Sequence, residues 1–144
     1  MNYPNWNLNL EYSFGKSDRL LVDKRPLVLA IDDNHDNLEL LAQILDLFGY
    51  ECVKALDGRT DLSVAVSRPP DLILLDICLP DIDGIELMSR LKQNPQLINI
   101  PIIAVTALAK AEDRDRILLA GCVAYISKPF DIDRLEITIQ RYLN

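Results

Sequence analysis

The chain has 144 residues, of which 49% are hydrophobic and 26% charged, and its formal net charge is -7. This size and composition are typical of a single soluble globular domain with a short appendage. The acidic balance disfavours direct nucleic-acid binding, and the lack of any long apolar run disfavours both a membrane span and a signal peptide, so we expect a cytoplasmic protein.

Residues 1–25 differ from the rest of the chain and are interpreted as an N-terminal extension. They hold four basic and three acidic residues, so that the remainder carries about -8. Every second residue from Trp6 to Phe14 is apolar, a period of two that is typical of a half-buried strand. We expect residues 1–25 to be a flexible, disordered tail, or the result of a start codon placed too early. The alternation leaves open that the segment pairs with a sheet edge in the same or a neighbouring chain.

From Pro26 to Asn144, strand and helix patterns alternate five times in one domain. Short apolar runs predict strands at 27–31, 50–55, 72–75, 102–105 and 123–127. Helical periodicity predicts helices near 38–48, 60–67, 85–92, 110–120 and 132–142. Short, wholly apolar strands separated by helices are buried on both faces, so the pattern predicts an α/β fold with a doubly wound, five-stranded parallel sheet.

Polar side chains follow four of the five predicted strands. Asp32 and Asp33 follow the first strand, Asp76 the third, Thr106 the fourth and Lys128 the fifth. Because ligands of open parallel sheets bind beyond the carboxyl ends of the strands, we expect these groups to meet at one edge. Each also has a plainer interpretation when taken alone. Asp32 or Asp33 could cap the following helix, and the others could be loop or surface residues.

A cluster of three carboxylates requires a cation. One pair of such charges about 4 Å apart costs roughly 4 kcal/mol at an effective dielectric constant of 20. Carboxylate oxygens suit Mg²⁺, which keeps several waters and leaves room for a phosphate oxygen. A carboxylate beside that metal can act as a nucleophile toward phosphorus. Lys128 and Thr106 would then meet the charge on the transferred group.

Four sequence blocks resemble the signature blocks of response regulator receiver domains. They are IDDN at 31–34, LLDICLPDIDG at 74–84, PIIAVTA at 101–107 and YISKPF at 125–130. The resemblance covers about Pro26 to Asn144. It implies a flavodoxin-like, chemotaxis-regulator-like fold with strand order 2-1-3-4-5. It also implies a single-domain regulator of a two-component system, which catalyses only its own phosphorylation and dephosphorylation.

The resemblance implies a metal site and a phosphoacceptor. Asp76 is the expected phosphoacceptor. Asp33 is expected to bind Mg²⁺ directly, and Asp32 to act mainly through bound water. Asp76 itself and the backbone carbonyl of Cys78 are expected to complete the protein ligands.

The resemblance also implies a switch. Lys128 is expected to pair with Asp76 before phosphorylation and with the phosphoryl group afterwards, and Thr106 to bind a phosphoryl oxygen. The Tyr125 ring is expected to follow the movement of Thr106. The Lys128–Pro129 peptide bond is expected to be cis. The surface expected to change is the fourth helix, fifth strand and fifth helix, about residues 110–142.

A sensor histidine kinase or a histidine phosphotransfer protein is the expected phosphoryl donor. Leu143 and Asn144 end the last predicted helix, so no output domain is expected, and the signal should pass to a downstream protein, a homodimer or a phosphorelay. One alternative is an aspartate-nucleophile phosphatase, but such enzymes place a second carboxylate two residues after the nucleophile, where this chain has Cys78. The other is a non-phosphorylated pseudo-receiver, which the complete set of acids, Thr and Lys disfavours.

The three cysteines and the single histidine are given plainer roles. Cys52, Cys78 and Cys122 are odd in number and widely spaced, which fits neither a disulfide framework nor a zinc site. We expect reduced thiols, and a redox role for Cys78 beside Asp76 stays open. His35 is expected to lie in solvent at the start of the first helix.

Overall fold

The computed structural model describes residues 25–77, 83–107, 111–129 and 131–143. Three sequence-based predictions lie outside these residues: the alternating segment from Trp6 to Phe14, the Cys78 carbonyl ligand, and Lys110 at the start of a predicted helix.

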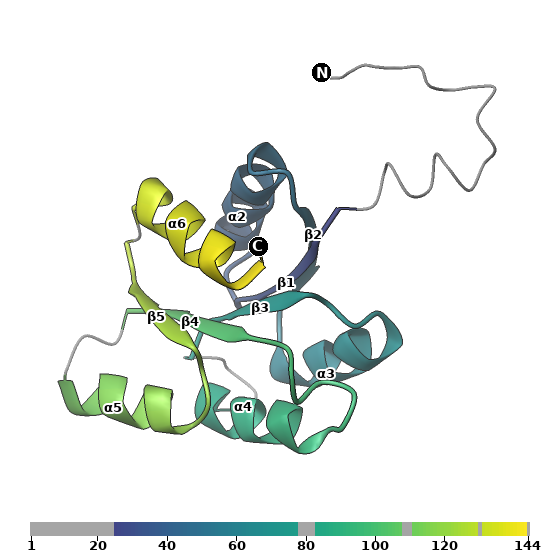
Figure 1. The fold of residues 1–144 in the computed structure, drawn as a ribbon, viewed down its shortest axis with the longest axis vertical. Coiled ribbons are helices and arrows are strands. Elements are labelled where there is room, and N and C mark those ends of the chain that lie inside the picture. The colour runs from purple at the N-terminus through teal and green to yellow at the C-terminus, as the bar shows by residue number, and fades with distance from the viewer. Residues whose placement is uncertain (1–24, 78–82, 108–110, 130, 144) are drawn as a thin grey trace.

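The described chain alternates strictly between strands and helices. Its strands form a parallel sheet in the order β2-β1-β3-β4-β5, which confirms the predicted fold class and strand order (Figure 1). The strands are β1 (Leu27–Ile31), β2 (Glu51–Ala55), β3 (Leu72–Leu75), β4 (Ile102–Thr106) and β5 (Ala124–Ser127). The helices are α2 (His35–Leu47), α3 (Gly58–Ser67), α4 (Gly84–Gln93), α5 (Ala111–Leu119) and α6 (Ile132–Leu143).

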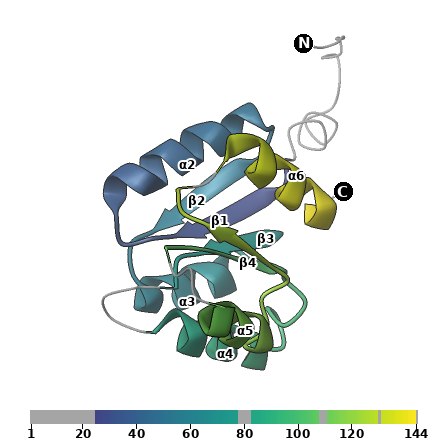
Figure 2. The same cartoon turned by 90° about the vertical axis from the view of Figure 1, so that its left-hand side faces the viewer.

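The helices cover both faces of the sheet. α2 and α6 lie on one face, and α3, α4 and α5 lie on the other (Figures 1 and 2). Every residue of the three inner strands β1, β3 and β4 is buried, whereas the edge strands β2 and β5 are only partly buried. Successive side chains of a strand point to opposite faces, so the sheet separates two apolar clusters, one under each helix layer.

The predicted boundaries agree with the structure to within a few residues. Tyr50, which was predicted to begin the second strand, lies instead in the turn that follows α2. Its N–H donates to Leu45 O at 2.9 Å, and the Gly49 N–H donates to Asp46 O at 3.0 Å. Gly49 has φ of 93°, a conformation that glycine adopts without steric cost. Tyr50 therefore closes the end of α2, and the strand begins one residue later than its apolar character suggests.

Candidate functional site

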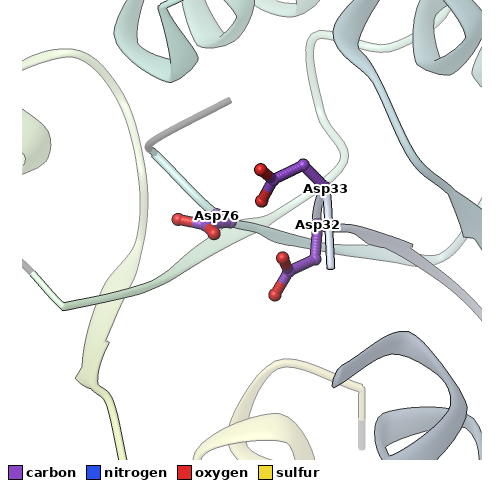
Figure 3. A group of neighbouring side chains, drawn as sticks. All are labelled: Asp32, Asp33 and Asp76. Carbon is purple, nitrogen blue, oxygen red and sulfur yellow. The ribbon is translucent and has the colours of Figure 1, made fainter. Parts of the chain in front are cut away.

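Three carboxylates meet beyond the carboxyl ends of two adjacent strands. Asp32 and Asp33 follow β1, and Asp76 follows β3 (Figure 3). One carboxylate oxygen from each lies within 4.8 Å of the others. Asp32 and Asp76 are buried and Asp33 is exposed. The structure therefore brings together the acids that the sequence placed at this edge, and leaves one side of the cluster open to solvent.

Hydrogen bonds of the sheet fix the backbone positions of Asp32, Asp76 and Lys128. The Asp76 N–H donates to Ile31 O at 2.9 Å, and the Asp32 N–H donates to Ala55 O at 3.1 Å. The Lys128 N–H likewise donates to Thr106 O at 2.9 Å. Each bond continues a parallel ladder by one residue past the end of the strand. The backbone at the site is therefore held by the hydrogen bonds of the sheet.

Lys128 reaches two of the three acids. Its Nζ lies 2.8 Å from Asp32 Oδ2 and 3.1 Å from Asp76 Oδ2. The resemblance implied a pair with Asp76, and the structure adds Asp32 at the shorter distance. The Lys128–Pro129 bond is cis, the isomer that the resemblance implies. One ammonium thus offsets the charge of both buried carboxylates.

The charges of Asp32 and Lys128 support each other. Burial alone would raise the pKa of Asp32, but hydrogen bonds from Lys128 and from the Asn34 N–H outweigh it and hold that pKa below its usual value. Burial would also lower the pKa of Lys128. Its hydrogen bond to Asp32 and the charge of Asp76 outweigh this and raise that pKa. Both groups are consequently ionised at neutral pH.

Two asparagines hold Asp32 in place, and the sequence did not assign them this role. The Asn34 N–H donates to Asp32 Oδ1 at 2.9 Å, and Asn37 Nδ2 donates to Asp32 Oδ2 at 3.4 Å. Asn34 is also the N-cap of α2, because its Oδ1 accepts the Asn37 N–H at 2.9 Å. The alternative in which Asp32 or Asp33 caps this helix is therefore wrong. The preference of asparagine for N-cap positions was the available signal.

Thr106 and Tyr125 lie on the half of the sheet that also carries Lys128. Thr106 ends β4 and is fully buried, and it lies opposite Ser127 of β5 in the parallel ladder. Tyr125 in β5 is half-buried against the apolar cluster on the α3, α4 and α5 face. Ser127 Oγ lies 3.5 Å from the Tyr125 hydroxyl. His35 begins α2 and is exposed, as expected.

Gly84 sets the close approach between the start of α4 and the residue after Asp76. Its N–H donates to Ile77 O at 3.0 Å. A Cβ at this position would lie 2.6 Å from Ile77 Cα and 2.7 Å from Ile77 O, and both distances are steric clashes with the backbone. Glycine is therefore needed here, and the sequence block that contains it, at 74–84, did not reveal this reason.

An apolar hollow of about 510 Å³ opens beside Lys128. It lies between α2 and the start of α6, and Leu40 and Ile132 in its wall are each about half exposed. The full lining is Asn37, Leu40, Ile44, Ala107, Lys128, Pro129 and Ile132. Sequence reasoning missed this hollow because its wall comes from four separate segments.

The acidic cluster fits a magnesium ion by its donor chemistry. All three groups offer carboxylate oxygens, and the exposed Asp33 leaves one side for water or phosphate oxygens. Lys128 offsets part of the charge, but one ammonium faces three carboxylates among the described residues.

No helix in the described part of the chain is long and apolar enough to cross a membrane.

The sequence and the fold were compared with those of known proteins. The sequence model of the response regulator receiver domain matches residues 28–140. The polar-differentiation response regulator DivK of Brucella anthropi is 42% identical over 116 residues, which are 81% of this chain and 94% of that protein.

Solved structures agree with this match. Chemotaxis protein CheY4 of Vibrio cholerae superposes with a TM-score of 0.79 at 29% identity, over 83% of this chain and all of that one. The receiver domain of sensor histidine kinase PA1611 from Pseudomonas aeruginosa gives 0.77 at 31% identity, over 83% and 98% of the two chains. That structure has a magnesium ion coordinated in its active-site cleft.

Proposed function

This chain belongs to the response regulator receiver domains of two-component systems, and we propose that it signals through Mg²⁺-dependent phosphorylation of Asp76. Receiver domains are signal transducers rather than enzymes that turn over separate substrates. The single observation that carries the proposal is the convergence of Asp32, Asp33 and Asp76 within 4.8 Å, beside the Lys128 ammonium. We also infer that the protein acts in the cytoplasm, as sensor kinases and their receivers must meet there.

In the proposed reaction an Asp76 oxygen forms a bond to the phosphorus of the donor. The bond between phosphorus and the donor breaks, and its electron pair leaves with the donor. The magnesium ion would be held by Asp32, Asp33 and Asp76. The fourth proposed ligand, the Cys78 carbonyl, lies outside the described residues. Bound there, the ion supplies positive charge that offsets the phosphoryl oxygens. Lys128, whose Nζ lies 3.1 Å from Asp76 Oδ2, supplies the second positive charge.

The proposed switch couples Asp76 to the α5–β5–α6 face. A phosphoryl group adds negative charge and three strong acceptor oxygens, which Thr106 and Lys128 at the ends of β4 and β5 are placed to contact. Thr106 is fully buried, so its movement requires the half-buried Tyr125 ring to move as well. The altered face then binds a downstream protein or a second copy.

The donor surface is proposed to be the apolar hollow beside Lys128. A sensor histidine kinase or histidine phosphotransfer protein must bring its phosphorylated side chain to Asp76. The hollow lies next to the Lys128 that contacts Asp76, and its half-exposed Leu40 and Ile132 offer apolar contact area.

Acetyl phosphate with Mg²⁺, followed by intact-mass measurement, tests the phosphorylation. The wild-type protein gains one phosphoryl group, and Asp76→Asn gains none. Omission of Mg²⁺ prevents the gain. A wild-type protein that stays unlabelled at every Mg²⁺ concentration would favour the pseudo-receiver, and full labelling of Asp76→Asn would refute the assigned acceptor.

Two matched substitutions in α2 test the donor surface. Leu40→Asp places a charge in the wall of the hollow, whereas Leu47→Asp places it at an 85% exposed position at the far end of the same helix. We expect Leu40→Asp to slow phosphoryl transfer from a cognate donor protein at least about tenfold, the cost of about 1.4 kcal/mol at a contact, and to leave labelling by acetyl phosphate unchanged. Equal transfer rates in both variants would place the donor elsewhere.

Thr106→Ala tests the switch. The variant still accepts the phosphoryl group, since Asp76 and Lys128 are intact. Hydrogen exchange in α5, β5 and α6 then changes much less on phosphorylation than in wild type. Thr138→Ala in α6, whose hydroxyl donates to Arg134 O within the helix, is the control and responds as wild type does. Exchange changes confined to α2 and α3 would show that the output face is misplaced.

A further inference from the structure

The strand β2 is an open edge of the sheet next to the start of the described chain. Among the described residues it pairs with β1 alone. The Glu51 N–H donates to Pro26 O, and Ala55 O accepts the Asp32 N–H, so residues 51, 53 and 55 face β1. In a parallel ladder the alternate residues direct their backbone groups away from it. Cys52 and Lys54 therefore direct their N–H and C=O groups outward, where another strand can bind them.

An apolar flank runs along this edge on the α3 side of the sheet. Val53 in β2 and Leu62 and Val64 in α3 are only partly buried, although all three pack against the core cluster on this face. Val66 in the same helix is 42% exposed. The α2 side of the edge is ionic instead, because Lys54 pairs with Glu39 of α2. The edge is thus apolar around Val53 and Ala55 on its α3 side, where Glu51 at its start pairs with Arg68, and ionic at Lys54 on its α2 side.

We propose that residues 6–14 of the same chain bind this edge as an additional strand, antiparallel to β2. The segment alternates apolar residues from Trp6 to Phe14 with polar ones, and so has one face for each face of the edge. Its apolar face covers Val53 and the α3 flank, and its polar face lies on the ionic side. An antiparallel edge strand on an otherwise parallel sheet is a common arrangement.

Charge and spacing select one register. Glu11 is the only acidic residue in the segment, and Lys54 is the only basic residue in β2. Opposing them places Tyr12 beside Val53 and Leu10 beside Ala55, so the apolar residues share one face. Phe14 then lies opposite Glu51, two strand spacings or about 10 Å from the start of β1. The residues between 14 and 25 reach up to about 36 Å, so the connection is easily made.

Tethering makes a weak contact sufficient. A segment joined to its site by a short flexible linker has an effective concentration of about 1 mM or more, so an intrinsic dissociation constant in that range already gives substantial occupancy. The same segment from a second copy lacks this advantage at micromolar protein concentrations. The chain's own segment is therefore the favoured occupant. The contact involves neither Asp76 nor Lys128, so it stands or falls independently of the phosphorylation.

Residue-resolved hydrogen exchange on the full chain tests the proposal. In the wild type the Cys52 and Lys54 amides are hydrogen-bonded to the added strand. In this register Ser13 lies opposite Cys52 and its N–H donates to the Cys52 carbonyl, whereas the Leu10 and Tyr12 N–H groups point away from β2. Ser13→Pro removes this donor, and Ser17→Pro makes the same change in the connecting residues. We expect both amides to exchange about tenfold or more faster in Ser13→Pro than in the wild type and Ser17→Pro.

Three outcomes are distinguishable. Slow exchange of the two amides in a monomer, independent of concentration and lost in Ser13→Pro, supports the proposal. Equally fast exchange in all three proteins overturns it, since the edge is then open. Slow exchange that disappears on dilution, with a dimer at higher concentration, assigns the segment to a second copy and overturns the intramolecular contact.

Discussion

The two ends of the sheet use charged side chains in opposite ways. At the amino ends of the strands, Asp71 Oδ2 accepts the Leu27 N–H at 2.7 Å, and the Asp71 N–H donates to Leu27 O at the same distance. Lys92 Nζ nearby donates to Ile98 O and Ile100 O, each at 3.2 Å. At the carboxyl ends, Lys128 contacts Asp32 and Asp76 instead of backbone carbonyls.

This difference separates stabilising charges from those of the proposed phosphorylation site. A carboxylate or ammonium that hydrogen-bonds backbone groups at the end of a sheet stabilises the fold, and it needs no bound ligand to do so. Carboxylates that face one another repel, and this repulsion lowers the stability of the folded state until a cation binds. Charge type alone therefore does not mark the functional acids of this chain. The acids of the proposed site differ from Asp71 in that Asp32 and Asp76 both contact the Lys128 ammonium.

The largest expected effect is that of Lys128→Met. Methionine keeps most of the length of the side chain but removes the ammonium, so Asp32 and Asp76 are left with uncompensated charge. Without metal at pH 7, we expect the free energy of unfolding to fall by about 3 kcal/mol, the lower end of the range for a broken buried pair, because Lys128 is 21% exposed.

Arg90→Met is the matched control for that change. Arg90 pairs with Glu86 one helical turn away, and both side chains are at least half exposed. Its loss should cost about 0.5 kcal/mol or less in the same urea titration. Equal losses in the two variants would contradict the distinction between the carboxyl end of the sheet and an ordinary surface pair.

A smaller loss of about 2 kcal/mol is expected for Asp71→Ala, since the buried Leu27 N–H loses its acceptor. Asp71→Asn keeps a side-chain oxygen at this position and should lose less. Both variants should be phosphorylated at the wild-type rate. A slowed reaction in Asp71→Ala, with stability unchanged, would reverse the roles assigned to the two ends.

Asp33→Asn should change stability in the opposite direction. It removes one of three crowded carboxylates, so we expect the metal-free protein to gain up to about 1 kcal/mol. Mg²⁺ should raise the melting temperature of the wild type and leave this variant nearly unchanged, because the cation binds the native state only. Asp36→Asn, an exposed acid in the first turn of α2, is the control and should keep the wild-type Mg²⁺ response.

The smallest effect near neutral pH concerns Cys52 in the middle of β2, away from both ends of the sheet. Burial raises the pKa of this thiol to about 11. The folded state then holds the thiol proton more tightly than the unfolded state does, so the free energy of unfolding falls as pH rises from about 9 toward 11. Cys52→Ser should flatten this fall in urea titrations, and identical curves for the two proteins would contradict the raised pKa.

The sequence predicted those parts of the molecule that depend on local patterns. Short apolar runs marked all five strands, and the polar residues after four of them marked the candidate site, because parallel strands carry such residues to one edge. The contacts of Asp32 with Lys128, 96 positions away, could not be predicted in this way. The hollow beside Lys128 and the close approach of Gly84 to Ile77 depend likewise on how separate segments pack together.

The most direct test of the account locates the phosphoryl group chemically. Borohydride reduces an aspartyl phosphate to homoserine and leaves free carboxylates intact, so the peptide map of the treated protein reports the modified residue. After incubation with acetyl phosphate and Mg²⁺, we expect homoserine at position 76 and aspartate at positions 32 and 33. Homoserine at 32 or 33, or at no position in a protein that Mg²⁺ demonstrably stabilises, would contradict it.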